Sequence, residues 1–454
     1  MGLFQRLARL AKIASFRKLL LVRLATQSGD GTVQLAMASY ILFSPEKQTN
    51  AWAITMVLAI TLLPYSVLAP FVSAFLDRWS RRNIMVVSDS MRALIATTLA
   101  LLVGSGNHSL GIQTLLFVLL LMSTSLNRFL LSGLSAALPH TIDKKSYLDA
   151  NSVLPLIGPI GLMVGGIVAA SSRLGLGHWL PSHRTDSLSL FVAVAFFVTS
   201  VSVSITVGRH EWGPTLTEKS TSGSLTASLR AAGTQLCDGL RHIRKTTHIL
   251  IGFALITSAR ILFGLLTVAM MLATRHLFHD PSQANAALLD MGLWSAMSGA
   301  GFVVAPWIIA PLSQAISVRN TIVSIFGAGT LVMIFPTSIF SFIPQLVTSF
   351  LVGVLCQGVK ILVDTIVQAH CDNAFKGRVF VIYDIIFNVC LVVAASIMAA
   401  LGAPTGFSRG LIVGMTLTFA LTGLGFFLVS KRVGADSFNR GTPLELTSET
   451  ITTS

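Results

Sequence analysis

Long runs of mainly apolar residues recur along almost the whole chain, and they constrain the fold more than any other feature. A helix needs about 20 such residues to cross the hydrocarbon core of a membrane. Of the 454 residues, 53% are hydrophobic and only 11% are charged, so a soluble domain is excluded. We predict an all-α membrane protein with twelve spans, at residues 18–43, 51–76, 84–104, 111–137, 152–172, 188–207, 246–274, 288–312, 321–340, 344–369, 378–401 and 410–430.

The basic residues outside these spans are distributed unevenly, which matters because the net charge is +14. If the N-terminus is cytoplasmic, most of them fall on the cytoplasmic side. The external loops then hold only Lys47, Arg173, Arg184, Arg275 and Arg409. This asymmetry follows the positive-inside rule. It predicts a multi-pass protein of the cell membrane (plasma or inner) with both termini in the cytoplasm, and no nucleic-acid partner.

A polar stretch divides the spans into two sets of six. We expect a cytoplasmic amphipathic N-terminus at 1–17, an N-terminal six-helix bundle at 18–207 and a cytoplasmic linker at 208–245. A C-terminal six-helix bundle at 246–430 and a cytoplasmic disordered tail at 431–454 follow. The linker is expected to begin as a flexible segment and to end in a helix from Leu225 to Lys245. Parallel six-helix repeats with a binding site between them are a recurrent transporter plan.

Polar residues occur at helical spacing in the first, fourth, seventh and tenth spans. Steps of three or four residues place each set on one helix face. A charge in the middle of a membrane costs roughly 2.5–3.5 kcal/mol, so it normally faces a bundle interior or a wet cavity. We therefore predict a polar pathway for substrate and protons that comprises Arg23, Gln27, Asp30, Arg128, Arg260, Lys360, Asp364 and Gln368.

Two of the predicted pathway carboxylates have a structural alternative. Asp30 is the best proton-carrier candidate, because burial disfavours the charged form of a carboxylate. Its alternative is a permanent ion pair with Arg23 or with a residue on another helix. Asp364 follows Lys360 by one helical turn, so Lys360 could neutralise it within the helix.

Three further charged residues of the spans carry similar alternatives. Arg260 could attract an anionic group of a substrate or balance the charge of Asp30. Asp89 and Arg92, three residues apart in the third span, are expected to form a local pair.

The four cysteines lack the spacing of a metal site, and we expect neither a disulfide nor a bound metal.

The short loop between the second and third spans reads Asp77-Arg78-Trp79-Ser80-Arg81-Arg82. It resembles the signature of the major facilitator superfamily (MFS), Gly-x3-Asp-Arg-x-Gly-Arg-Arg/Lys, with Ser73 and Ser80 in place of the glycines. A cytoplasmic anchor would explain the arginines but not the aspartate. By this resemblance, the loop latches the cytoplasmic side against the start of the eleventh helix. The implied cytoplasmic gate residues are Asp77, Arg78, Arg81, Arg82 and Arg378. Asp384 shares a face of the eleventh helix with Asn388, and we assign it to the gate as well.

More of the chain is similar to one subgroup, the bacterial drug and macrolide efflux-like permeases. The fifth span also approximates the antiporter signature Gly-Pro-x2-Gly-Gly, although close helix packing explains small residues equally well. The stretches that carry the subgroup resemblance are Arg23-x3-Gln27-Ser28-Gly29-Asp30, Leu134-Ser135-Ala136-Ala137-Leu138-Pro139, Asp238-Gly239-Leu240-Arg241 and Lys376-Gly377-Arg378-Val379. The resemblance implies two pseudo-symmetric six-helix bundles, the MFS fold.

The resemblance also implies a secondary active transporter that works by alternating access. Proton-coupled export of a small amphipathic or drug-like compound is favoured. An importer or a lipid or lysolipid flippase is the alternative, and a non-transporting receptor or scaffold is a remote one. The sequence contains no nucleotide-binding loop or nucleophile–base pattern, so we expect no enzyme activity and no cofactor. The expected partners are a small-molecule substrate, protons or another coupling ion, and the lipid bilayer, and we expect a monomer.

Overall fold

The computed structural model forms two compact units. It describes residues 9–42, 51–52, 54–59, 62, 79–107, 109–142, 147–177, 179–208, 211–213, 225–280, 283–334, 341–372 and 375–439. Unit 1 comprises Met1–Lys47 and Ile60–Thr234, and unit 2 comprises Gln48–Ala59 and Gln235–Ser454.

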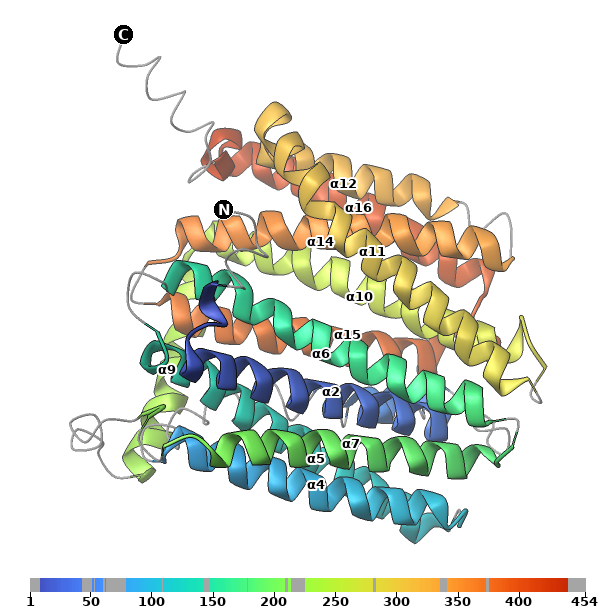
Figure 1. The fold of residues 1–454 in the computed structure, drawn as a ribbon. Helices are drawn as coiled ribbons and strands as arrows, with labels where there is room; N and C mark the ends of the chain where they lie inside the picture. The colour runs from blue at the N-terminus through green and yellow to red at the C-terminus, as the bar shows by residue number, and fades with distance from the viewer. Residues whose placement is uncertain are drawn as a thin grey trace. The chain divides into compact units, whose positions relative to one another are not determined.

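Within unit 1, long helices run side by side (Figure 1). They are α2 (Ala14–Leu42), α4 (Arg81–Gly104), α5 (Leu110–Ala137), α6 (Tyr147–Leu176) and α7 (Ser182–Ile205), with the short 3-10 helix η1 (Leu138–His140) after α5. Helix α2 packs against α6 and α7, and α4 packs against α5 and α7. The interior of the unit is therefore built around α2 and α7.

Unit 2 repeats this plan with its own helices. It contains α10 (Thr247–His276), α11 (Ala284–Ile316), α12 (Val318–Val332), α14 (Phe342–His370), α15 (Lys376–Leu401), α16 (Arg409–Val433) and the 3-10 helix η3 (Ala435–Asn439). The boundary between the units falls within α9 (Leu225–Lys245), which is the helix expected at the end of the linker. Helix α10 packs against α14 and α15, α11 against α14, and α12 against α16.

The predicted spans coincide with these helices, except that 51–76 lies mostly outside the described residues. In the described part of the chain, nine helices are long and apolar enough to cross a membrane. Helix α12 is shorter, and α2 carries several charged residues, so neither is among the nine. The expectation of an all-α protein with many spans is confirmed.

Two helix pairs occur in both units at equivalent places in the order of predicted spans. The first and fifth spans pair as α2 and α6 in unit 1, and their counterparts pair as α10 and α15 in unit 2. The third and sixth spans pair as α4 and α7, and their counterparts as α12 and α16. This repetition supports the pseudo-symmetry inferred from the sequence.

Glycines set the closest helix contacts in each unit. In α6, a Cβ added at Gly165 would overlap the carbonyl oxygen of Ser28 in α2. In unit 2, a Cβ at Gly301 of α11 would meet the backbone of α14, and one at Gly353 of α14 would meet the backbone of α11. Small residues allow this approach, which is a principal source of helix association in lipid.

The start of the linker is packed rather than flexible as far as it is described. Trp212 is fully buried, and its Nε1 donates a hydrogen bond of 3.1 Å to Ser15 Oγ near the start of α2. The backbone N–H of Arg81 donates to the carbonyl oxygen of Gly213 at 3.2 Å. Residues 211–213 therefore tie α2 and α4 together, and residues 214–224 lie outside the described part.

Residues 431–439, expected to be disordered, instead form the end of α16 and η3. Phe438 is 1% exposed and packs against Phe426 and His248. Asn439 Oδ1 accepts a hydrogen bond of 3.2 Å from the N–H of Val318, at the start of α12. The segment binds α10, α12 and α16 because it offers a buried ring and a helix-capping acceptor. Residues 1–8 of the expected amphipathic N-terminus and the tail from 440 lie outside the described residues.

The glycine packing predicts opposite effects for two neighbouring residues of α6. In Gly165→Ala the new Cβ forces α6 away from α2, and we expect a loss of about 1–3 kcal/mol in stability, as for other overpacked sites. Gly166→Ala is the control, because no atom lies within 4 Å of the added Cβ; its better helix propensity should raise stability by up to about 1 kcal/mol. Thermal unfolding of the detergent-solubilised protein measures both, and equal midpoints would contradict the packing argument.

Candidate functional site

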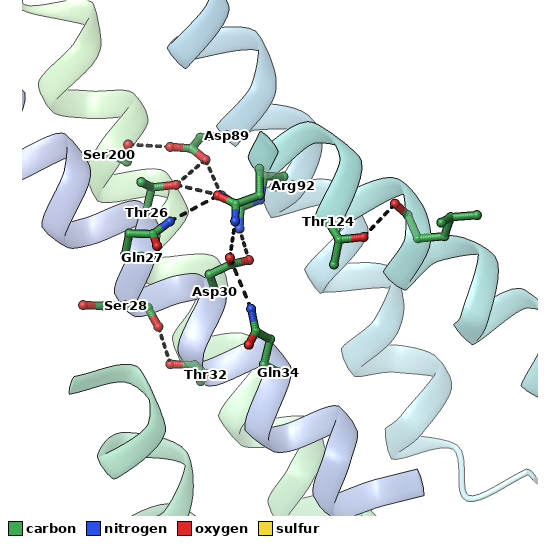
Figure 2. A network of polar contacts seen from close by, with 12 residues as sticks. Thr26, Gln27, Ser28, Asp30, Thr32, Gln34, Asp89, Arg92, Thr124 and Ser200 are labelled. Atoms are coloured by element: carbon green, nitrogen blue, oxygen red, sulfur yellow. Dashed lines mark hydrogen bonds and ion pairs between the residues drawn. The ribbon is translucent and has the colours of Figure 1, made fainter. Parts of the chain in front are cut away.

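A buried charge network lies inside unit 1 and joins α2, α4 and α7 (Figure 2). Arg92 of α4 lies between two carboxylates. Its Nη1 is 3.1 Å from Asp89 Oδ1, and its Nη2 forms an ion pair with Asp30 Oδ1 of α2. Arg92 and Asp89 are fully buried, and Asp30 is 3% exposed. We call Asp30, Asp89 and Arg92 the triad.

Hydroxyl groups complete the surroundings of Asp89. Ser200 of α7 donates to Asp89 Oδ2 at 2.5 Å, and Thr26 of α2 donates to Oδ1 at 2.9 Å. Thr26 Oγ1 in turn accepts from Arg92 Nη1 at 2.7 Å. The hydroxyl groups and the guanidinium all direct hydrogens at the carboxylate, which is the arrangement that stabilises its charged form.

Amide groups complete the surroundings of Asp30. Asn127 Nδ2 of α5 donates to Asp30 Oδ2, and Gln34 Nε2 donates to the same oxygen at 3.4 Å. Gln27 Nε2 donates to Asn127 Oδ1 at 3.2 Å and so orients the amide of Asn127. Gln27 and Asp30, two of the polar residues predicted on the first span, are therefore buried in the interior of unit 1.

The ring of Phe197 in α7 covers Arg92, with 4.2 Å between the guanidinium carbon and the ring centre. A Cβ at Gly29 would overlap this ring, so only glycine at this position of α2 leaves room for it. The ring is itself fully buried and contributes a cation–π contact. With two carboxylates and one guanidinium, the triad carries a formal excess of one negative charge.

The structure identifies the ion-pair partner of Asp30 and extends the expected local pair. Asp30 pairs with Arg92 on another helix, and Arg23 is not its partner. Asp89 and Arg92 form the pair expected from their spacing, but that pair is part of a larger network. Sequence reasoning missed Asn127 and Ser200. Their only signal was that each is a polar residue within an apolar run.

A second polar group lies in unit 2. Lys360 Nζ is 2.6 Å from Asp364 Oδ2, so the pair within α14 forms. Arg260 of α10 stacks on the ring of Phe387 in α15, with 3.7 Å from the guanidinium carbon to the ring centre. Its Nε is buried without a hydrogen bond. The predicted residues Arg260, Lys360 and Asp364 are thus brought close to α15.

The remaining predicted pathway residues are less closely grouped. Arg23 of α2 is half-buried against α6, and its Nε has no hydrogen-bond partner among the described residues. Arg128 is half-buried on α5, next to Asn127 of the network. Gln368 is exposed near the end of α14. Of the pathway residues predicted in unit 1, Gln27 and Asp30 thus belong to the network itself.

The predicted gate residues are described in part, since Asp77 and Arg78 lie outside the described residues. Within unit 1, Arg81 Nη1 lies 3.1 Å from His140 Nε2, and Arg82 Nη2 donates to the carbonyl oxygen of Ile205 at 3.3 Å. Both arginines therefore bind groups of their own unit.

The other two predicted gate residues lie on α15 in unit 2. Arg378 lies over the ring of Phe375, with 5.2 Å from the guanidinium carbon to the ring centre. Asp384 is exposed, and its backbone carbonyl oxygen accepts from Asn388 Nδ2 at 2.8 Å.

Two residues that were assigned to external loops are buried in helices, so that assignment is wrong. Arg173 of α6 is 2% exposed and donates to Asp186 Oδ2 of α7 at 2.7 Å and to Ser39 Oγ of α2. Arg275 is 2% exposed in the last turn of α10. Hydropathy ended the spans too early because each helix extends past its apolar stretch and buries a charge there.

Removal of Arg92 should be far more costly than removal of an exposed arginine. Arg92→Met leaves two buried carboxylates without a counter-charge, and breaking a buried pair costs about 3–5 kcal/mol. Arg241→Met is the control, because Arg241 forms an exposed pair with Asp238 at 3.2 Å, worth about 1 kcal/mol or less. Adding Asp30→Asn to Arg92→Met should recover part of the loss. Chemical unfolding in detergent measures these differences, and similar losses for both single variants would argue against a stabilising triad.

Three solved transporters share this fold. A nucleoside transporter, NupG, superposes with a TM-score of 0.62 over 90% of this chain and 98% of its own, at 11% identity. A POT family transporter in complex with 5-aminolevulinic acid superposes with a TM-score of 0.59 over 92% of this chain and 96% of its own, at 12% identity. A bacterial homologue of the iron transporter ferroportin in its outward-facing state superposes with a TM-score of 0.53 over 91% of this chain and 99% of its own, at 16% identity. These likenesses concern the fold alone.

Sequence comparison adds the family. The chain is 30% identical over 446 residues to uncharacterized MFS-type transporters of Mycobacterium tuberculosis and Mycobacterium bovis, covering 95% of this chain and 93% of each relative. The profile of the Major Facilitator Superfamily matches residues 19–395. Its members are membrane transporters of small molecules and not enzymes. The chain belongs to the Major Facilitator Superfamily and is a multi-pass secondary transporter.

Proposed function

We propose that this transporter exports a small amphipathic or drug-like compound in exchange for protons. The proposal takes the family as given and adds direction, coupling ion and substrate class. The observation that carries it is the triad, in which Asp30 and Asp89 share the single guanidinium of Arg92. A membrane-embedded group with one excess negative charge favours the uptake of one proton.

The contacts of Asp30 suit a reversible proton carrier. Its partners among the described residues are uncharged or shared: Asn127 and Gln34 are neutral amides, and Arg92 also pairs with Asp89. When Asp30 is protonated, Arg92 keeps Asp89 as its counter-charge, so no charge in the triad is left unpaired. Protonation can then alternate with substrate binding at a modest energetic cost.

The proposed pathway and gate are those predicted from the sequence. The pathway comprises Arg23, Gln27, Asp30, Arg128, Arg260, Lys360, Asp364 and Gln368, and the gate comprises Asp77, Arg78, Arg81, Arg82, Arg378 and Asp384. We propose that the bundles at 18–207 and 246–430 work by alternating access. The termini and the linker at 208–245 would lie on the cytoplasmic side of a bacterial cell membrane. The positive-inside asymmetry supports this orientation.

The efflux subgroup is proposed on the motifs quoted above. The solved transporters of this fold, which include transporters of nucleosides and peptides, show that the fold alone does not select a substrate. An importer or a lipid or lysolipid flippase would have the same fold. Flux of a lipid without any dependence on the proton gradient would favour the flippase.

Proton movement in inverted membrane vesicles tests the proposal. Amphipathic compounds with a cationic, a neutral or an anionic group are added in turn to energised vesicles, and a pH-sensitive dye reports the interior. At least one compound should cause protons to leave, and Asp30→Asn should abolish this movement, because an amide cannot exchange the proton.

Asp280→Asn serves as the control, because Asp280 is an exposed carboxylate just beyond α10. It should leave the proton signal unchanged at matched expression. Undiminished, pH-insensitive flux in Asp30→Asn would remove Asp30 from the carrier role, and flux without any proton signal in the unmodified protein would overturn proton coupling.

A further inference from the structure

Unit 2 contains a half-buried cation, Arg260, for which the described residues provide no counter-charge. Arg260 forms neither a hydrogen bond nor an ion pair anywhere in the described part of the chain, and its Nε is buried. Its contacts are aromatic: the guanidinium carbon is 3.7 Å from the centre of the Phe387 ring and 5.5 Å from that of Phe263. Proteins rarely bury a donor atom without an acceptor, because its desolvation is then uncompensated.

A second cation lies against the same ring. Lys360 Nζ is 5.9 Å from the centre of Phe387 and 5.6 Å from that of Tyr383. The charge of Lys360 is matched by Asp364 at 2.6 Å, while that of Arg260 is not matched by any described residue. Asp364 is paired with Lys360, so the guanidinium of Arg260 is left to attract an anion at this ring.

The other buried polar atoms of this group have a neighbour of their own. The hydroxyl of Tyr383 lies beside the carboxyl group of Asp364, which can accept its hydrogen. Arg260 Nε is therefore the donor beside Phe387 that lacks an acceptor among the described residues. A bound molecule with an acceptor group would satisfy it, since a buried polar group is normally hydrogen-bonded.

Aromatic rings extend from this polar group along one face of α15. Phe380, Tyr383 and Phe387 follow one another at helical spacing, with 6.0 and 6.3 Å between successive ring centres. Phe253 of α10 packs edge-on against Tyr383 at 5.6 Å. Such rings bind flat or apolar bodies, and a few polar groups beside them orient the ligand.

We propose that Arg260 and Lys360 bind the anionic group of an organic anion, whose aromatic or apolar body lies against Phe387 and its neighbouring rings. The inference rests on the proposed function, because it names the substrate class of the same transporter. A cationic compound would be repelled by these two side chains.

Binding of two matched probes to the full-length protein in lipid nanodiscs tests the inference. The probes are 2-naphthoate and 2-naphthamide, which share a ring body and differ in charge. At constant ionic strength, 2-naphthoate should bind at least about tenfold more tightly, the advantage of a charged hydrogen bond over a neutral one. Titration calorimetry in the absence of any proton gradient measures both affinities.

Variants then assign the preference to the site. Arg260→Gln should remove the advantage of 2-naphthoate and leave the affinity for 2-naphthamide unchanged, and Arg260→Lys should keep part of the advantage. Arg409→Gln is the control, since it removes an exposed cation of unit 2. Equal affinities for the two probes, no detectable binding of 2-naphthoate, or a preference that survives Arg260→Gln would each overturn the inference. If the protein prefers 2-naphthoate but shows no proton-coupled flux, the proposed proton coupling is contradicted and the inference about the bound anion stands.

Discussion

Ionised side chains inside a membrane bundle must find their partners within the protein, and this requirement organises unit 1. Arg92 pairs with Asp30 from α2 and with Asp89 from its own helix, and Thr26 and Ser200 supply hydroxyl groups from α2 and α7. Lipid offers no hydrogen bonds, so the removal of any one partner would leave a buried polar group unsatisfied. The network therefore fixes the relative positions of three helices, and the remaining helices of the unit are arranged around it.

Close helix packing makes this network possible. Gly29 leaves room for the Phe197 ring that covers Arg92, and Gly165 lets the backbone of α6 approach that of α2. Interhelical attraction in lipid comes from such close packing, because lipid tails are as apolar as the helix surfaces. The small residues of the fifth span, which also suggested an antiporter signature, therefore have a direct structural role at Gly165. Gly166, beside it, has no neighbouring atom within 4 Å of an added Cβ and no such role.

Most of the helices could be predicted from the sequence, because spans of apolar residues have few alternatives in a membrane. Their ends could not, since Arg173 and Arg275 are charged and yet buried within a last helical turn. The burial of Asp30 within the bundle could be predicted from its place in a polar stripe, but its partner could not. Periodicity shows which residues share one helix face and leaves open which other helix meets that face. Arg92 was identified only as a neighbour of Asp89 for this reason.

The two units treat their membrane charges differently, and this difference favours separate roles. The carboxylates of the triad are surrounded by donors from the protein itself, so their charged state needs no ligand. In unit 2, Arg260 has only aromatic contacts among the described residues, and its buried Nε has no acceptor there. A group that is already satisfied suits the exchange of a proton, which changes charge without changing shape. A group that lacks an acceptor suits a ligand that supplies one. In the proposed exchange, the proton would then bind in unit 1 and the substrate would contact unit 2.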